Sequence, residues 1–279
     1  MAKKVVETDT RFAIPKKLST HGPARIIAMC NQKGGVGKTT TAVNMAAALA
    51  EYGRKVLVVD FDPQGALSAH LGVIAVPGEI ATIYDLMKGT IKDPHEVIRP
   101  SPVKNLDLIP ANIDLSVAEI ELVNEVARES ILANILRKVA DEYDVIIIDC
   151  QPSLGLLNVN ALTAAHGVLI PMATDFFALR GVALLKDQIN KVQDRLNPAI
   201  KLDGILVTLH ERTLHSKEVL DRLHEAFGSF VFKTQISRAV KFKDATVAQL
   251  PITAYAPTSE AAESYRSVAR ELISRGCAP

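Results

Sequence analysis

Short runs rich in β-branched residues alternate with amphipathic segments along most of this chain. From Arg25 onward the runs with the composition of buried strands are RIIAMC, KVLVVDF, NLDLI, YDVIIID, GVLIPM, DGILVTL and FVFKTQI. The segments with helical periodicity are 39–52, 156–165, 179–196, 213–227 and 259–274. This alternation predicts an α/β fold, a doubly wound and mostly parallel β-sheet with helices on both of its faces.

The chain divides into a short N-terminal segment and one domain. Residues 1–24 hold five lysine and arginine residues against two acidic ones, with little periodic apolar content. This composition predicts a flexible basic tail, which is either a solvated extension or a weak contact for DNA or a partner. Residues 25–279 contain neither a linker nor an internal repeat, so we expect a single domain there.

Composition excludes some classes of protein. A net charge of +1 over 279 residues gives no overall attraction to nucleic acid, so any contact with DNA must come from a local basic cluster. The three cysteines have neither disulfide-framework nor metal-site spacing, which fits a reducing cytoplasm. No signal peptide and no membrane-spanning segment is expected.

A glycine-rich turn, CNQKGGVGKTTTA, follows the first predicted strand. Its ending Gly37-Lys38-Thr39 is that of a phosphate-binding loop, in which backbone N–H groups and a lysine hold phosphate and the hydroxyl meets Mg²⁺. The usual pattern requires a glycine where Gln32 stands. A second lysine, Lys33, has no task in an ordinary loop of this kind.

Acidic residues end two further predicted strands. Asp60 and Asp62 leave the second strand two residues apart, and Asp149 ends the apolar run VIIID. Ligands of open parallel sheets bind at the carboxyl ends of the strands, where these carboxylates meet the glycine-rich loop. One of the first two acids can orient the magnesium shell and the other a water, and Asp149 can hold the metal through water. Together the three features predict a site for a nucleoside triphosphate and Mg²⁺.

Three blocks of sequence resemble the ParA family of chromosome and plasmid partition ATPases. They are KGGVGKTTTAVNMAAALAEYGRKVLVVDFDPQG, the segment 142–162 and FFALRGVALL. The family belongs to the deviant Walker A group of P-loop NTPases, together with MinD and the nitrogenase iron protein. The resemblance covers about 25–273, and it implies an ATPase that binds ATP or ADP with Mg²⁺ and turns over slowly by itself.

The resemblance implies a role for each matching position. Lys38 would bind the β and γ phosphates, Asp62 would position the attacking water, and Thr39, Asp60 and Asp149 would hold the metal. The residues expected to bind the nucleotide are Lys33, Gly34, Gly35, Val36, Gly37, Lys38, Thr39 and Thr40.

Lys33 matches the signature lysine of the family, which resembles an arginine finger supplied by the other subunit of an ATP sandwich homodimer. The positive charge of Lys33 would then reach phosphate only after dimerisation, so ATP binding would lead to association of two subunits. Catalysis is therefore assigned to Lys33, Lys38 and Asp62.

The family also implies partners. The C-terminal region carries basic residues in HERTLHSKEV and ISRAVKFKDATVAQLPI, and Arg212, Arg238 and Lys241 match positions that bind double-stranded DNA without sequence preference. The implied cycle has a nucleoid-associated dimer in the cytoplasm, released when a ParB-like centromere-binding protein stimulates hydrolysis. No membrane contact is expected, because 259–279 has a core-facing stripe with mixed charges opposite rather than a basic amphipathic face.

Two departures from the family pattern and two alternatives stay open. Gln151 stands where proline is usual, and Ala173-Thr174-Asp175 replaces a Gln-Cys or Cys-Glu pair. The chain could also position a cargo other than a chromosome or plasmid, or it could be a metabolic ATP-dependent ligase or kinase.

Overall fold

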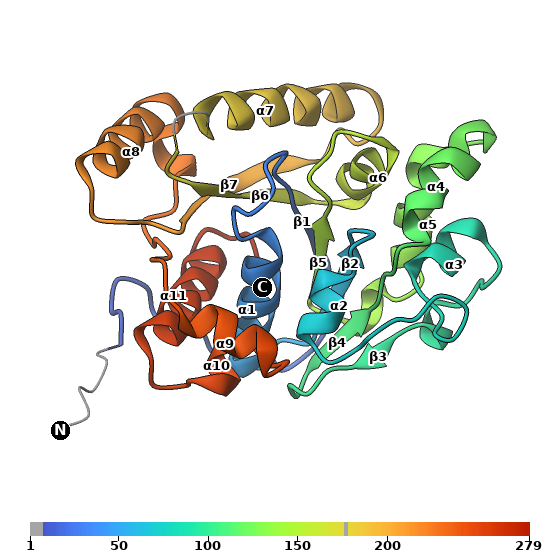
Figure 1. Cartoon of the computed structure of the whole chain (residues 1–279), viewed down its shortest axis with the longest axis horizontal. Helices are drawn as coiled ribbons and strands as arrows, with labels where there is room; N and C mark the ends of the chain where they lie inside the picture. Colours follow the sequence, from blue (N-terminus) through green and yellow to red (C-terminus); the bar gives the residue numbers. More distant parts are fainter. Residues whose placement is uncertain (1–7, 176–177) are drawn as a thin grey trace.

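The computed structural model describes residues 8–175 and 178–279 and shows one seven-stranded sheet between two layers of helices (Figure 1). The strands are β1 Arg25–Met29, β2 Val56–Phe61, β3 Arg99–Pro100, β4 Leu106–Ile109, β5 Val145–Cys150, β6 Gly167–Ala173 and β7 Lys201–Thr208. Their order across the sheet is β3-β4-β2-β5-β1-β6-β7. All neighbours are parallel except β3 and β4, so the predicted fold class is confirmed.

Eleven α-helices of the described residues cover the two faces of the sheet. They are α1 Lys38–Glu51, α2 Ala66–His70, α3 Ile83–Lys88, α4 Leu115–Glu121, α5 Ile131–Arg137, α6 Leu156–Ala164, α7 Ala178–Arg195, α8 Leu214–Phe227, α9 Lys241–Val247, α10 Ile252–Tyr255 and α11 Glu260–Ser274. Short 3₁₀ helices lie at Pro94–Glu96, Leu122–Asn124, Arg128–Ser130, Ala140–Glu142 and Gly228–Phe230.

Each face of the sheet has its own apolar core. Successive side chains of a strand point to opposite faces, so Ile27 and Met29 of β1 pack with α1, α2 and α9 to α11. Ile26 and Ala28 pack on the other face with α3 to α8. Strands buried on both faces read as continuous apolar runs, which is why the sequence identified six of them.

The expectation of a strand at FVFKTQI is wrong. Only Val231 forms a bridge, to Ile205 of β7. The N–H groups of Lys233 and Thr234 donate to the carboxylate of Glu271 on α11, both at 2.8 Å. These donors are therefore taken by a side chain, and the segment bends along β7 instead of adding an eighth strand.

The N-terminal segment packs on the domain from Asp9 onward, unlike the flexible tail that the sequence predicts for 1–24. The N–H of Asp9 donates to Glu263 of α11 at 3.1 Å, and Arg54 donates to the carbonyl oxygen of Lys16 at 2.8 Å. Residues 1–7 of that predicted tail lie outside the described residues.

Asp144 anchors the end of this segment. It is buried just before β5, and its carboxylate accepts from the N–H of Gly22 at 3.0 Å and from the N–H of Lys55 at 2.7 Å. The ring of His21 also lies 2.7 Å from it. One carboxylate thus connects residues 21–22 to the amino ends of β2 and β5.

The last helix is packed as the sequence predicts. Tyr265, Val268 and Leu272 of α11 are buried against α1, and the Tyr265 hydroxyl lies 3.2 Å from the Thr41 hydroxyl. In the described part of the chain, no helix combines the length and the apolar character needed to cross a bilayer.

We expect Asp144→Ala to lower the free energy of unfolding by about 2–4 kcal/mol, because two backbone N–H donors lose their buried acceptor. Urea denaturation measures this change. Asp141→Ala is the matched control, since Asp141 is exposed and a surface substitution changes stability by about 0.5 kcal/mol or less. Equal effects of the two substitutions would contradict the anchoring role of Asp144.

Candidate nucleotide site

The glycine-rich loop connects β1 to α1 at the carboxyl edge of the sheet. Gly35 and Gly37 have φ angles of 73° and 81°, which side chains rarely adopt. A Cβ atom added at Gly34 or Gly35 would meet nothing within 4 Å, so this side of the loop faces open space. The loop therefore has the turn and the free volume that phosphate oxygens require.

Two side chains fix the glycine-rich loop to the sheet. Asn31 donates to the carbonyl oxygen of Pro171 in β6 at 2.7 Å and accepts from the N–H of Lys33 at 2.9 Å. Thr208 at the end of β7 donates to the carbonyl oxygen of Val36 at 2.7 Å. The sequence did not identify Asn31 or Thr208, because neither residue type distinguishes itself before the strands are placed side by side.

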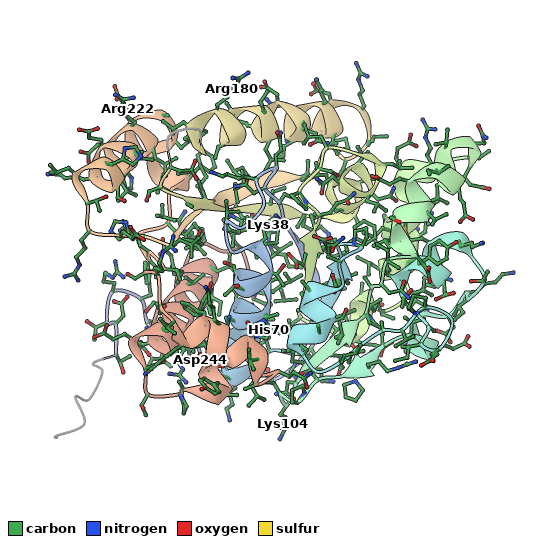
Figure 2. All side chains as sticks on the ribbon, viewed as in Figure 1. Lys38, His70, Lys104, Arg180, Arg222 and Asp244 are labelled. Atoms are coloured by element: carbon green, nitrogen blue, oxygen red, sulfur yellow. The ribbon has the colours of Figure 1, made fainter. Side chains whose placement is uncertain are left out.

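Lys38 is the first residue of α1 and is buried in the loop (Figure 2). Its Nζ donates to the carbonyl oxygen of Lys33 at 3.3 Å, so the side chain folds back over the loop. The N-terminus of a helix attracts anions through its free N–H groups and its dipole. Helix and lysine thus place positive charge at one point.

A cavity of about 480 Å³ opens beside this point. Its lining comes from the loop, from the turn after β2, and from α9 and its preceding segment; it includes Gly34, Gly35, Gly37, Lys38, Thr39, Thr40, Asp62, Thr208, Arg238, Phe242 and Lys243. Phe242 offers an aromatic edge, and the volume fits a small organic ligand. Of the predicted nucleotide-binding residues, Lys33 and Val36 do not line this cavity.

Asp60 and Asp149 are register partners in the neighbouring strands β2 and β5. Asp149 is 1% exposed, and neither of its carboxylate oxygens has a hydrogen-bond partner among the described residues. Burial, together with the nearby Asp60, raises the pKa of Asp149 to about 8. Burying a charged carboxylate without hydrogen-bond donors is unfavourable, and a bound cation would compensate for that cost.

The site fits Mg²⁺. Magnesium is usually held by one or two carboxylates together with phosphate oxygens and a hydroxyl. Asp149, Asp60 and Thr39 supply such oxygens next to the loop, and no group of three or more His, Cys, Asp or Glu in the described chain could hold a metal by itself. These residues therefore suit a cation that arrives with a phosphate ligand.

Asp60 has a second task that the sequence did not reveal. Its Oδ2 accepts from both the N–H and the hydroxyl of Ser68 on α2, at 2.8 and 2.6 Å. The Ser68 hydroxyl oxygen in turn accepts from the N–H of Ala111 at 3.0 Å. Burial raises the pKa of Asp60 to about 6 despite these bonds. Asp60 thus also ties β2 to α2 and to the segment after β4.

Asp62 lies in the turn after β2 and lines the cavity. Its Oδ1 accepts from the N–H of Gln64 at 3.0 Å, and its own N–H donates to Asp60 at 3.4 Å. Its carboxylate is half-buried rather than sealed off, so it can bond to a water in the cavity.

Lys33 points to a different place from Lys38. Its Nζ lies 2.7 Å from Oδ2 of Asp175, just beyond β6. Both residues line a second cavity of about 310 Å³, adjoining the first along the glycine-rich loop. The two lysines of the loop therefore face different cavities, and no sequence pattern indicates the acidic partner of Lys33.

The three predicted DNA contacts lie close to this region. The segments after β7 and before α9 meet through a bridge between His210 and Ser237, which brings the loops of Arg212 and Arg238 together. Lys241 begins α9 and is exposed. Arg238 lines both cavities and lies 2.8 Å from Glu211, so it belongs to the rim of the nucleotide site as well.

The remaining chemical groups of the site are structural. Cys30 directly follows β1 and Cys150 ends the neighbouring strand β5; both are fully buried, and their sulfur atoms lie 3.2 Å apart. Gln151, which stands where the family usually has proline, donates from Nε2 to Glu119 of α4 at 3.2 Å. Proline has no such donor, so this substitution adds a contact between β5 and α4.

Comparison with known proteins agrees with this geometry. The family model described as "AAA domain" matches residues 24–202. An uncharacterized protein of Mycobacterium tuberculosis is 55% identical over 94% of this chain and 82% of its own length. The chromosome-partitioning ATPase Soj of Treponema pallidum is 46% identical over 90% of this chain and 98% of its own.

A solved structure from Mycobacterium smegmatis, named cobyrinic acid a,c-diamide synthase, contains a bound ATP analog and magnesium. It is 38% identical, covers 90% of this chain and 94% of its own, and superimposes with a TM-score of 0.78. The cavity, the two lysines and the buried carboxylates thus occur in a chain whose relatives include partitioning ATPases. The chain belongs to the ParA/Soj family of partitioning ATPases and is itself an ATPase.

Proposed function

We propose that this ATPase drives DNA partitioning through a nucleotide-dependent homodimer. Mg-ATP closes a sandwich of two subunits, the dimer binds double-stranded DNA without sequence preference, and a ParB-like partner stimulates hydrolysis and release. The observation that carries the proposal is the separation of the two loop lysines. Lys38 is buried and lines the first cavity, whereas Lys33 is directed away from that cavity.

The residues of one subunit are sufficient to bind the nucleotide. The N–H groups of the loop and of the first turn of α1 hold phosphate oxygens, and Lys38 neutralises their charge. Thr39, Asp60 and Asp149 would hold Mg²⁺, which withdraws charge from the phosphates when it is bound. Asp62 faces the cavity and orients a water for attack on the terminal phosphate.

The second subunit supplies Lys33 to the nucleotide site of the first. Lys33 is 52% exposed at its side chain and lies at the entrance of the glycine-rich loop. From there it can extend across a subunit boundary and add positive charge to the phosphates of the facing site. Hydrolysis then depends on association, and a long-lived ATP dimer with slow turnover follows.

DNA binding depends on the same association. If Arg212, Arg238 and Lys241 of each subunit contact phosphates, a dimer makes roughly six contacts and loses on the order of 10³ in affinity between 50 and 200 mM salt. A monomer makes half as many contacts and binds far more weakly. ATP thereby controls attachment to the nucleoid, in the cytoplasm.

The names of the relatives support a role in partitioning. The Treponema pallidum relative is named for chromosome partitioning, and the Bacillus subtilis protein Soj, a sporulation initiation inhibitor by name, is 44% identical. A related ATPase that positions another cargo would share the nucleotide site. The identity of the partner protein therefore distinguishes DNA partitioning from the positioning of another cargo. The name of the Mycobacterium smegmatis structure keeps a metabolic ligase as the second candidate.

Sedimentation of the protein with DNA tests the proposal. We expect co-sedimentation with Mg-ATP and little with ADP or without nucleotide, because only the ATP state doubles the number of phosphate contacts. DNA should also stimulate ATP hydrolysis in the absence of any small-molecule acceptor. Turnover that requires an acceptor and ignores DNA would favour the ligase.

Replacing Arg212, Arg238 and Lys241 together by Glu should abolish co-sedimentation and flatten the dependence of DNA affinity on salt, because the phosphate contacts are lost. ATP-driven dimerisation, measured by analytical ultracentrifugation, should persist. The matched control replaces the exposed residues Lys92, Lys104 and Arg137 by Glu, with the same change of net charge. Unchanged DNA retention in the first variant would place the contact surface elsewhere.

Lys33→Ala should bind Mg-ATP with nearly normal affinity, because Lys33 lies outside the cavity of its own subunit. Stimulated hydrolysis should fall by roughly 10³-fold or more, as for other groups supplied in trans. Nucleotide titration and phosphate release measure the two quantities. Normal dimerisation together with normal turnover is the result that refutes the role in trans.

Asp62→Ala should trap an ATP-bound dimer on DNA, since the attacking water loses its orienting carboxylate. Retention on immobilised DNA after excess ADP is added measures the trapped state. Asp114→Ala, at the N-cap of α4, is the control for removing one partly exposed acid. Ordinary turnover by the Asp62 variant would assign the water to another group.

A further inference from the structure

The contact between Lys33 and Asp175 has the geometry of a close ion pair. Nζ lies 2.7 Å from Oδ2, and the exposed fractions of the two side chains are 52% and 32%. Oδ1 of Asp175 is buried and has no hydrogen-bond partner in the described part of the chain. The carboxylate therefore depends on Lys33 for its charge balance.

Both ends of this pair rest on fixed backbone. The N–H of Lys33 is held by Asn31, which also binds β6. Asp175 follows β6 in a turn whose N–H donates to the carbonyl oxygen of Ala173 at 3.0 Å, and its neighbour Thr174 lies 2.9 Å from the hydroxyl of Ser216 on α8. The pair thus connects the ends of the adjacent strands β1 and β6.

The other charged groups of the second cavity do not replace Asp175. Glu211 is the other acid there, and it already lies 2.8 Å from Arg238. His215 also lines this cavity. Asp175 is therefore the acid that holds Lys33, and it holds the lysine toward the second cavity rather than toward Lys38.

We propose that Asp175 is a positioning residue that holds Lys33 within its own subunit and must release it before Lys33 contacts the nucleotide of the partner subunit. This inference rests on the proposed dimer. The triphosphate of the facing site carries more negative charge than one carboxylate, so it outcompetes Asp175 only when two loaded subunits meet. Asp175 thereby sets the threshold for dimerisation.

The size of the effect follows from the exposure of the pair. Each partly exposed ion pair shifts an equilibrium by roughly 1.5- to 5-fold. Two such pairs must break when the dimer forms. A substitution that removes the pair from both subunits should therefore strengthen dimerisation by roughly 2- to 30-fold. Exposed charges are screened within about 10 Å at 0.1 M salt. The difference between the variant and the unaltered protein should therefore shrink as salt is added.

Asp175→Asn is the direct test, with sedimentation measured against protein concentration in a non-hydrolysable ATP analogue and Mg²⁺. We expect half-dimerisation at a lower concentration than for the unaltered protein, with the gain reduced at high salt. Asp175→Glu keeps the charge and should restore the original threshold. Asp194→Asn, on the exposed far end of α7, removes one carboxylate elsewhere and should change nothing.

A second measurement examines the contact in the monomer. Without nucleotide, acylation of Lys33 followed by mass spectrometry should be faster in Asp175→Asn, because the amine is no longer held by a carboxylate. An unchanged acylation rate, or dimerisation equal to or weaker than that of the unaltered protein, overturns the inference. Failure of the unaltered protein to dimerise would instead remove the proposed function, and a thermal melt verifies that the variant is folded.

Discussion

The register of three neighbouring parallel strands determines most of this site. Asp149 of β5 has Met29 of β1 and Asp60 of β2 as its register partners, so a buried carboxylate pair and the start of the phosphate loop meet at one edge of the sheet. The apolar cores on both faces keep these strands in place. Bringing two carboxylates together in a buried region is unfavourable unless a cation accompanies them. The loop can bind the phosphate ligand with which such a cation arrives.

Much of this arrangement could be predicted from sequence because it depends on local patterns. The β-branched runs identify six strands, and the motif ending in Lys38 and Thr39 identifies the loop. Carboxyl ends of parallel strands converge, so Asp60, Asp62 and Asp149 could be placed near one another before the structure was known. The error at FVFKTQI has a distinct cause: the propensity for a strand was present, but Glu271, about forty residues later, takes the backbone donors.

Contacts between residues far apart in the chain could not be predicted in this way. Asn31 and Thr208 hold the loop through carbonyl oxygens of Pro171 and Val36, and a carbonyl oxygen has no sequence signature. The partner of Lys33 was equally hidden, since Asp175 appeared only as a departure from the family pattern. The packing of residues 21–22 depends on the buried carboxylate of Asp144, which nothing in the basic composition of the N-terminal segment reveals.

That packing gives the molecule two unlike edges. Residues 16–22 lie at the amino ends of β2 and β5, through the contacts of Arg54 and Asp144, whereas the carboxyl edge carries the glycine-rich loop and its two cavities. A head-to-tail filament would need both edges as contact surfaces, including the edge that carries the N-terminal segment. A closed two-fold pair uses one edge twice and leaves that segment in place. In the proposed homodimer the N-terminal segment would thus lie at the edge away from the subunit contact.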